Sequence, residues 1–563
     1  MKEVLKNNKL YMGIKIIISA LVSFTLMMDK TLVFNGSIAG KISETYFNSI
    51  TAKDVIFGIG MFAIIYIIIT IFQILSDKIE CKVFVKENKR DAKMFFIVFG
   101  ILIVLWLPYI LSYFPGGVFA DTIVSINEAL GKTKLYNHNP VLHTLTLRFF
   151  FFIGGLISET NKISIGLKIY TVFQTLAMAA VLAYFVYWTD KKGLAKKYIV
   201  LEIAFFGLFQ LFPLYALSIW KDTPFSLVLF LYIIFIADII YDKGENIKGL
   251  KGILHYIVLM SLVVFLRNNG IYIVIATTLL LFLRFRKEIL KTLRKFLIAT
   301  IIAITICYTI QGPVFTMLGM NTEFVESIGV LLQQMCYVVV KDGNITEEQR
   351  EYINNILPIE TIKNVYNPCL VDLVKWNEEF NGKYIDENKK EFFKVWFELL
   401  LQNPTAYIKA YMLNTIGFWD MNKANSNSYV NIVMWPTLAG DKQYEQEDYI
   451  KNITGNSLRT YLEPRIFVSS AIFLMCLLIG ILNTFYKKRY ENLLIYMPIV
   501  FAWGTIMLAV PVAFSLRYVY ILVLTVPLSL IIPFLENKKE QKEEIENKGE
   551  EENEKNSCVN TML

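Results

Sequence analysis

The stretch YFPGGVFADTIVSINEALGKTKLYNHNPVLHTL, residues 113–145, interrupts a chain that is otherwise mostly apolar. It contains a Pro-Gly-Gly turn, the carboxylate Asp121 and two of the three histidines of the protein, His138 and His143. Pro and Gly end helices and mark turns, so a helix that precedes this stretch should stop near Phe114. The side of the membrane on which this polar stretch lies sets the orientation of every segment that follows it.

The composition predicts a polytopic membrane protein. The chain has 563 residues, 55% of them hydrophobic and 14% aromatic, with a mean hydropathy of +0.48. A water-soluble protein of this length does not need so much apolar surface, whereas a set of membrane helices does. The first apolar stretch lacks a small-residue cleavage site and further spans follow it, which favours a membrane anchor over a removed signal peptide.

Twelve segments are predicted as membrane helices, because about 20 apolar residues cross a bilayer core. They lie at 11–28, 55–76, 94–113, 165–187, 198–218, 225–242, 252–266, 270–285, 296–312, 466–486, 493–513 and 517–535. A further apolar segment, 143–158, is short and carries His143 and Arg148 in its first half.

Positive charges decide whether 143–158 crosses, since cytoplasmic loops carry an excess of Lys and Arg. With the N-terminus inside and only the twelve spans crossing, every basic cluster falls on the cytoplasmic side. These clusters lie at 78–93, 190–197, 243–251, 284–295 and 487–489. If 143–158 crossed, each cluster after it would move outside. We therefore predict that 143–158 lies along the outer surface and that both chain termini are cytoplasmic.

The same assignment divides the chain into five parts of an all-α membrane protein. They are two N-terminal helices with a basic loop (1–93), a membrane core (94–312) that contains the first outer loop (114–164), an external, mostly helical domain (313–465), the C-terminal spans (466–535) and a charged tail (536–563). The composition of the tail is typical of disorder.

Asp121 lies near the start of a predicted short helix, ADTIVSINEAL, just outside the membrane. A carboxylate at this place suits a helix cap, and it equally suits a general base at a membrane surface. Both interpretations stay open on the sequence alone.

Three outer loop tips each carry one cation: Lys221, Arg267 and Arg517. Converging, they would hold an anion at the outer face, and the arginine fork suits phosphate. Taken singly, each is as well explained by reaching to lipid headgroups. The polar and aromatic neighbours at these tips are Trp220, Asp222, Asn268 and Asn269.

The sequence contains few residues spaced to bind a metal and no common nucleotide-binding motif. A metal held by His138 and His143 needs further ligands, and only Asp121 and Glu128 lie in the stretch. Hydrogen bonding to a sugar or phosphate, or simple placement at the membrane interface, is therefore favoured for the two histidines. The six cysteines form no CxxC or CxxH pair; Cys336 and Cys369 either pair or remain two free thiols. The chain has no Walker A loop, Rossmann glycine pattern, HExxH or GxSxG.

These features resemble the GT-C superfamily, multi-pass glycosyltransferases that take a sugar from a polyprenyl-phosphate donor. The matching pieces are the span 94–113, PGGVFAD with Asp121, NHNPVLHTL with His138, and the surface helix 143–158. The chain is most similar to uncharacterised bacterial members with WKD and RNNG blocks. The resemblance covers spans three to nine. The chain departs from the family in two respects: it has two additional spans at the N-terminus, and its first outer loop has the single residue Asp121 where many members have an acidic pair.

The resemblance implies inverting sugar transfer at the outer face of a bacterial plasma membrane. Asp121 would accept the proton of the acceptor hydroxyl, while Lys221, Arg267 and Arg517 would hold the lipid phosphate. The other residues implied in substrate binding are His138, His143, Trp220, Asp222, Asn268 and Asn269. The implied partners are a polyprenyl-phosphate sugar, a cell-envelope acceptor and membrane lipids, with no nucleic acid; a divalent metal is left open.

Two other functions remain as alternatives. A transporter or flippase of lipid-linked sugars or envelope precursors would need polar residues deep in several spans, and the predicted spans are nearly free of them. A non-catalytic scaffold would use the external domain to bind an envelope polymer.

Overall fold

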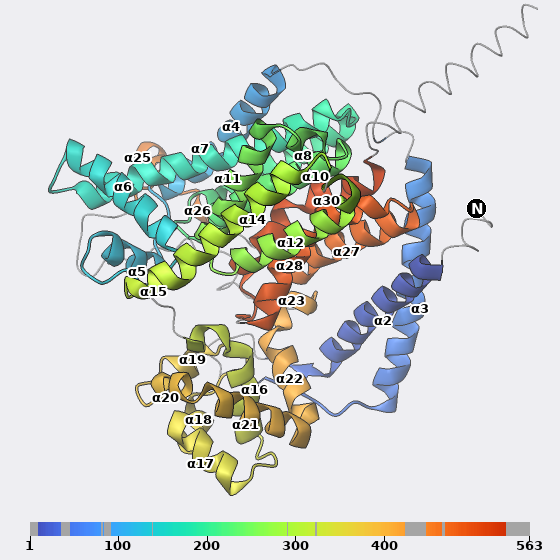
Figure 1. The fold of residues 1–563 in the computed structure, drawn as a ribbon, viewed down its shortest axis with the longest axis vertical. Helices are drawn as coiled ribbons and strands as arrows, with labels where there is room; N and C mark the ends of the chain where they lie inside the picture. Colours follow the sequence, from blue (N-terminus) through green and yellow to red (C-terminus); the bar gives the residue numbers. More distant parts are fainter. Residues whose placement is uncertain are drawn as a thin grey trace, which may run out of the picture.

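The computed structural model describes most of the chain, and within that part the protein is almost entirely helical (Figure 1). The described residues are 9–34, 45–79, 83, 92–137, 139–289, 291–320, 324–422, 446–463, 468–509 and 511–535. Their one sheet pairs β1 (Leu32–Val33) with β2 (Tyr46–Phe47) in antiparallel register. The predicted charged tail, 536–563, lies outside the described residues.

Seven of the described helices are long and apolar enough to cross a membrane, or eight if one bent pair counts as a single span. They are α2 (Lys9–Thr31), α3 (Ala52–Ile79), α4 (Lys93–Tyr113), α7 (Lys162–Lys191), α10 (Asp222–Tyr241), α14 (Arg294–Thr309) with its extension through the π-helical turn η4 (Ile310–Val314) into α15 (Phe315–Met317), and α28 (Leu493–Leu508). The bent pair contains α29 (Tyr520–Leu524) and α30 (Val526–Ile531), which meet at 45°. The protein is therefore an all-α membrane protein, as the composition predicts.

Several shorter helices complete this part of the molecule. They are α5 (Ala120–Ala129), α6 (Val141–Ile157), α8 (Lys196–Leu208), α9 (Leu211–Ala216), α11 (Leu250–Leu266), α12 (Gly270–Arg284), α13 (Arg286–Ile289) and α27 (Ser470–Tyr486). The predicted span 198–218 is divided between α8 and α9. The break falls before Pro213, which has no N–H to donate to the carbonyl of Phe209, four residues earlier.

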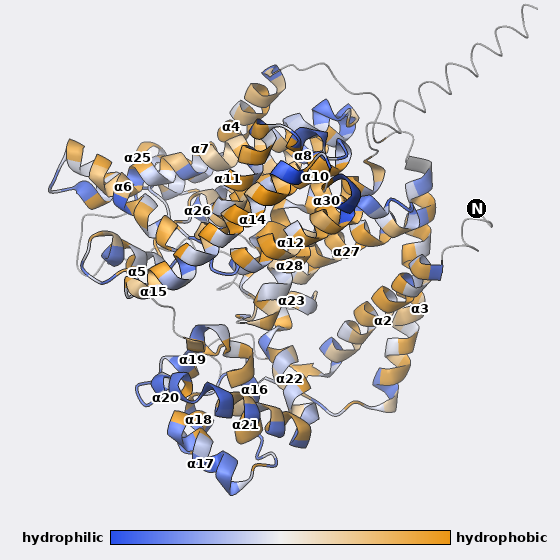
Figure 2. Ribbon diagram, viewed as in Figure 1, coloured by the Kyte–Doolittle hydropathy of each residue, from blue (hydrophilic) through white to orange (hydrophobic). Residues whose placement is uncertain are grey.

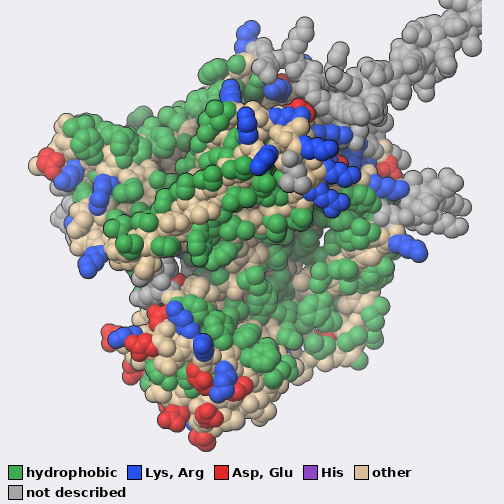
Figure 3. Space-filling model, viewed as in Figure 1, with side chains coloured by type: hydrophobic (Ala, Val, Ile, Leu, Met, Phe, Trp, Pro, Cys, Tyr) green, Lys and Arg blue, Asp and Glu red, His purple; other side chains and the backbone are tan. Residues whose placement is uncertain are grey.

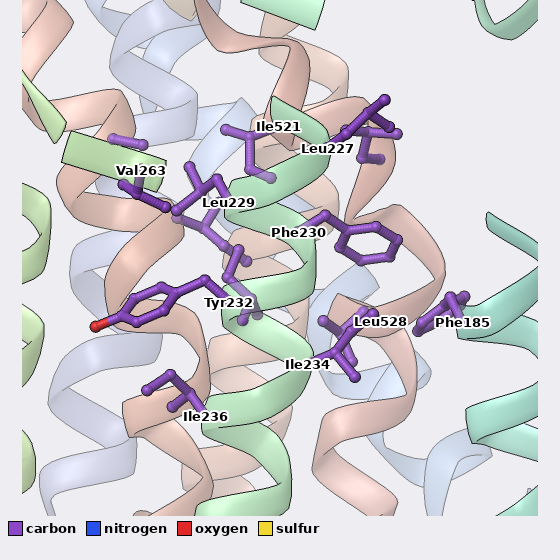
Figure 4. Close-up of a cluster of buried hydrophobic side chains, with 14 of the residues drawn as sticks. Phe185, Leu227, Leu229, Phe230, Tyr232, Ile234, Ile236, Val263, Ile521 and Leu528 are labelled. Atoms are coloured by element: carbon purple, nitrogen blue, oxygen red, sulfur yellow. The ribbon is translucent and has the colours of Figure 1, made fainter. Parts of the chain in front are cut away.

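The main hydrophobic core is centred on α10. Of its most apolar 18-residue window 78% is buried, against none in α3, so α10 is enclosed by protein while α3 presents its side chains outward. Figure 4 shows part of this core, in which Phe230 of α10 lies toward Phe185 of α7 and Leu229 of α10 lies toward Val263 of α11. The N-terminal helices α2 and α3 pack on each other at the edge of the molecule (Figure 1).

A second hydrophobic core lies among the helices below the membrane helices in Figure 1. These helices are α16 (Gly329–Val340), α17 (Glu347–Ile356), α18 (Ile359–Val365), α19 (Asp372–Lys375), α20 (Gly382–Glu387), α21 (Lys389–Gln402), α22 (Pro404–Asn414) and α23 (Ile416–Trp419). Cys336 and Cys369 are both buried here as free thiols. This group of helices also contacts the segment before α29. The Ala513 amide donates to the Cys369 carbonyl at 3.3 Å.

Polar and apolar residues separate in space. Figure 2 shows apolar residues concentrated on the membrane helices and polar residues on α16–α21. Figure 3 shows Lys and Arg side chains gathered at the end of the membrane helices that lies away from α16–α21. The helices α16–α21 carry both acidic and basic side chains (Figure 3).

α6 and α7 form a tight antiparallel hairpin. Gly154 of α6 and Gly166 of α7 are so close that a Cβ on Gly154 would overlap the backbone of α7, so the packing requires glycine at this position. The outward face of α6 carries the exposed apolar side chains Leu145, Phe149 and Phe152. This face suits lipid, while the prediction that the segment lies on the outer surface stays a prediction.

Two short helices, α25 (Tyr449–Thr454) and α26 (Arg459–Leu462), pack against the end of α4. Arg459 Nε donates to the Ser112 carbonyl at 2.7 Å, and the Glu447 amide donates to the Phe114 carbonyl at 2.8 Å. Residues 447–459 therefore fix the backbone immediately before the Pro-Gly-Gly turn. The short 3₁₀ turns are η3 (Glu245–Ile247), η5 (Phe324–Ser327), η6 (Tyr490–Asn492), η7 (Leu516–Val519) and η8 (Ile532–Phe534).

Candidate functional site

The Pro-Gly-Gly turn is joined by its backbone to the loop that precedes α10. The Gly117 amide donates to the Leu217 carbonyl at 2.8 Å, and the Ile219 amide donates to the Gly117 carbonyl at 3.0 Å. Gly116 has a φ of +104°, and a Cβ there would overlap the Leu217 oxygen. Glycine is therefore needed for the two loops to meet, and their meeting places the start of α5 beside the start of α10.

Side chains from α5 and α7 hold the same loop. Thr122 Oγ1 donates to the Ile219 carbonyl at 2.5 Å. Gln174 Nε2 donates to the carbonyls of Ala216 at 2.9 Å and Ser218 at 2.8 Å. Because these buried donors satisfy the loop carbonyls, the loop is held in one conformation.

Five charged side chains meet at this place: Asp121, Lys221, Asp222, Arg267 and Arg517. Arg517 Nη1 lies 3.0 Å from Asp121 Oδ2, and Lys221 Nζ lies 4.0 Å from the same oxygen. Arg267 Nη1 pairs with Asp222 Oδ1, and Arg517 Nε lies 4.0 Å from Asp222 Oδ2. We call this group the charge cluster; its three cations exceed its two carboxylates by one charge.

The two carboxylates of the charge cluster differ in accessibility. Asp222 is 1% exposed, whereas Asp121 is 32% exposed. The cations Lys221 and Arg517 are 14% and 20% exposed. Asp222 is therefore an internal partner for the arginines, and Asp121 can be reached from outside the protein.

Asp121 does not cap α5. The helix begins at Ala120, its N-cap is Phe119, and no side chain makes a capping hydrogen bond. Asp121 lies in the first turn, where the helix dipole favours a negative charge. The alternative that Asp121 is present only as an N-cap is therefore wrong.

Aromatic rings surround the two arginines. The Arg517 guanidinium carbon lies 5.6 Å from the Trp220 ring centre and 4.8 Å from that of Tyr518, whose hydroxyl accepts from Arg517 Nη2 at 3.0 Å. The Arg267 guanidinium carbon lies 5.1 Å from the Tyr518 ring and 5.5 Å from the Phe225 ring. These rings restrict the guanidinium groups and exclude water from one side of them, which strengthens their electrostatic interactions.

Asn139 contacts the charge cluster although the sequence did not single it out. Its Oδ1 accepts a hydrogen bond from Lys221 Nζ at 3.0 Å, and the residue is 1% exposed. Burial lowers the pKa of Lys221, while the neighbouring Asp121 and Asp222 oppose that change. The position of Asn139 in NHNP, between the two predicted histidines, was the available signal.

Glu128 is a second residue that the sequence did not assign to the site. It is 2% exposed on α5, and its Oε2 accepts from Thr144 Oγ1 of α6 at 3.2 Å. Burial raises the pKa of Glu128, and the Thr144 hydrogen bond opposes this. Arg148 Nε donates to the Ala129 carbonyl at 2.9 Å and Arg148 Nη2 donates to the Glu128 carbonyl at 3.3 Å, so these side chains of α6 hold the C-terminal end of α5.

His143, predicted to contact substrate, lies inside the packing of α5, α6 and α7. It is 2% exposed, and neither ring nitrogen has a hydrogen-bond partner among the described residues. Burial lowers the pKa of His143 to about 3, so the ring is neutral at physiological pH. Its position is that of a core residue closed to solvent, which does not support the predicted contact. His138 lies outside the described residues.

Asn268 and Asn269 join loops and so fix the place of Arg267. Asn268 Nδ2 donates to the Asn137 carbonyl, and Asn269 Nδ2 donates to Thr505 Oγ1 at 2.7 Å. Within the described residues, no group of three or more His, Cys, Asp and Glu side chains is arranged to hold a metal ion.

Comparison with known protein families gives a match over most of the chain. Residues 129–548 match the model of a family of unknown function, DUF6020. The matched range contains Lys221, Arg267 and Arg517 and begins after Asp121. No curated protein and no solved structure matches the chain. Because the match covers more than half of the sequence, the chain belongs to the DUF6020 family of unknown function.

Proposed function

We propose that this membrane protein is a glycosyltransferase of the GT-C type, which moves a sugar from a polyprenyl-phosphate donor to an acceptor at the outer face of a bacterial plasma membrane. The twelve-span arrangement with cytoplasmic termini and residues 143–158 on the outer surface belongs to this proposal. One observation carries it: the exposed carboxylate Asp121 lies within 4.0 Å of the cations Lys221 and Arg517, in a cluster with an excess positive charge.

The charge cluster has the groups that such a transfer needs. The cations hold the donor phosphate and stabilise its negative charge as the bond from the sugar carbon to the phosphate oxygen breaks. The electron pair of that bond leaves with the phosphate. The acceptor oxygen forms the new bond on the opposite face of the sugar, and Asp121 takes the acceptor proton.

The two carboxylates have different roles in this proposal: Asp222 is structural and Asp121 is chemical. A buried carboxylate such as Asp222 is stable only with partners, and it has Arg267 beside it. Asp121 is not buried, so folding does not require cations around it to offset desolvation. Two cations beside an accessible carboxylate fit a site that brings an anion and a proton acceptor together.

The proposal is tested by turnover of the donor. Purified full-length protein in lipid nanodiscs is mixed with a synthetic prenyl-phosphate sugar and a panel of acceptors, and free prenyl phosphate and glycosylated acceptor are measured together. We expect the two products to appear in equal amounts with an inverted sugar linkage. Absence of turnover for every donor, with binding retained, would count against a transferase.

Transport of a lipid-linked sugar is a second candidate, and Lys15 is the observation that favours it. This residue of α2 is 2% exposed, its Nζ donates to Thr70 Oγ1 at 2.5 Å, and it lies 3.8 Å from the Tyr66 ring centre. Ionisable residues inside membrane helices often mark transport paths. Movement of a fluorescent headgroup across a proteoliposome membrane, without product, would favour this candidate.

A further inference from the structure

Arg517 lies between the two carboxylates of the charge cluster. Its Nη1 is 3.0 Å from Asp121 Oδ2, and its Nε is 4.0 Å from Asp222 Oδ2. The first carboxylate is 32% exposed and the second is 1% exposed. One guanidinium group therefore connects the accessible carboxylate to the buried one.

The buried carboxylate has an acceptor that Arg517 can use. Asp222 Oδ1 pairs with Arg267, whereas Asp222 Oδ2 makes no hydrogen bond to any described residue. A buried oxygen without a donor is unfavourable, since it has lost water and gained no partner. A small movement of Arg517 Nε toward Asp222 would close this 4.0 Å separation and satisfy the oxygen.

The exposed carboxylate is engaged in the structure as it stands. Asp121 Oδ2 is the oxygen that both Arg517 and Lys221 approach. An acceptor hydroxyl that must give its proton to Asp121 would compete with Arg517 for this oxygen. A phosphate group offers several oxygens that match the arginine fork, so it can compete with Asp121 for Arg517.

We propose that binding of the donor phosphate transfers Arg517 from Asp121 to the phosphate and to Asp222 Oδ2, which leaves Asp121 Oδ2 open to the acceptor hydroxyl. This inference rests on the proposed function, because it concerns the same donor phosphate. Asp222 is then a positioning residue, and Asp121 becomes available only when a donor is in place. The acceptor is activated only beside a bound donor.

A double-mutant cycle on phosphate binding tests the exchange. Full-length wild type, Asp121→Asn, Arg517→Gln and the double variant are prepared in lipid nanodiscs, and the affinity for farnesyl phosphate is measured by titration calorimetry. Inorganic phosphate and farnesol form two further arms that separate a lipid phosphate from free phosphate and from the bare chain. Asp342→Asn is the matched control, because Asp342 pairs with Lys363 at 2.8 Å on the external helices.

If Arg517 must leave Asp121 to bind phosphate, Asp121→Asn removes the competitor. We expect farnesyl phosphate to bind roughly three- to tenfold more tightly to this variant, the range of the net contribution of one ordinary hydrogen bond. In the Arg517→Gln background the same substitution should leave affinity unchanged. The Asp342→Asn control should bind as wild type does.

Two results would overturn the exchange. Equal tightening in both backgrounds would mean that Asp121 only repels the phosphate, and weaker binding to Asp121→Asn would mean that Asp121 helps to hold it. Failure of wild type to bind either phosphate would instead remove donor binding from the proposed function. If inorganic phosphate gives the same cycle as farnesyl phosphate, the exchange stands with free phosphate as occupant. If Arg517→Gln does not fold, Arg517→Lys replaces it and should reduce the effect of Asp121→Asn.

Discussion

Replacing His143 by Phe should remove part of the acid sensitivity of the protein. The His143 ring is buried and its pKa is lowered to about 3, while an unfolded histidine titrates near 6.5. Since the folded pKa is the lower one, this residue contributes no pH-dependent loss above about pH 7, and stability falls as pH drops from about 6.5 toward 3. At pH 5, which is about 1.5 pH units below the unfolded pKa, protonation of the unfolded state costs the folded state about 2 kcal/mol of stability.

Phe fits the place of His143 because both ring nitrogens lack hydrogen-bond partners among the described residues. It also keeps the edge contact with the Tyr170 ring, whose centre is 6.1 Å away. The variant should therefore be at least as stable as wild type near pH 7.5 and gain about 2 kcal/mol relative to it at pH 5.

The assay is thermal unfolding of purified protein in detergent at a series of pH values between 5 and 7.5. Tyr170→Phe serves as the control, because it changes the same packing without a group that titrates in this range. Its difference from wild type should stay constant with pH. A His143→Phe curve parallel to that of wild type over the whole range would refute the assignment of His143 as a buried, neutral ring.

Two further substitutions test the backbone and the buried carboxylate near the site. Gly116→Ala should lower the thermal midpoint and abolish binding of farnesyl phosphate. The φ of Gly116 is +104°, and the added Cβ would overlap the Leu217 carbonyl. Gly131→Ala is the control: its φ is +73° with open space around it, so it should show only the smaller cost of backbone strain. Glu128→Gln should raise the thermal midpoint at neutral pH, because the folded state holds the Glu128 proton more tightly than the unfolded state does. That gain should grow as pH rises above the ordinary carboxyl range and vanish below it, and a difference that stays constant with pH would count against a raised pKa of Glu128 in the folded protein.

The predicted all-α membrane fold follows from the long apolar stretches, because a helix of about 20 apolar residues crosses a bilayer with its backbone hydrogen bonds satisfied within the segment. The lengths of the individual spans were predicted less accurately. Several of them correspond to helices of only 15 to 17 residues, such as α12 and α27. The predicted span 493–513 also runs five residues beyond Leu508, the last residue of α28.

The meeting of Lys221, Arg267 and Arg517 was accessible from the sequence, since each is a lone cation at a loop tip on one predicted side of the membrane. The contacts of Asn139 and Glu128 were not predicted, although NHNP marked the neighbourhood of Asn139. Their contacts depend on the packing of α5 against α6 and on the backbone pairing of Gly117 with Ser218, which no periodic pattern encodes.

His143 shows the opposite case. A histidine in a polar outer stretch suggests a substrate contact, yet the tight α6–α7 hairpin turns its ring into the protein. The close approach of Gly154 and Gly166 makes this possible, because bulkier residues would hold the two helices apart. Only the three-dimensional packing separates a buried histidine from an exposed one here.

The most direct test of the central claim is a single-turnover measurement on Asp121→Asn. The variant is first shown to fold and to bind farnesyl phosphate, and sugar transfer from the prenyl-phosphate donor is then followed with enzyme in excess. If Asp121 is the base, binding is kept and the rate falls by about 10²- to 10⁴-fold. Transfer at the wild-type rate would contradict the assignment of Asp121 and with it the proposed mechanism.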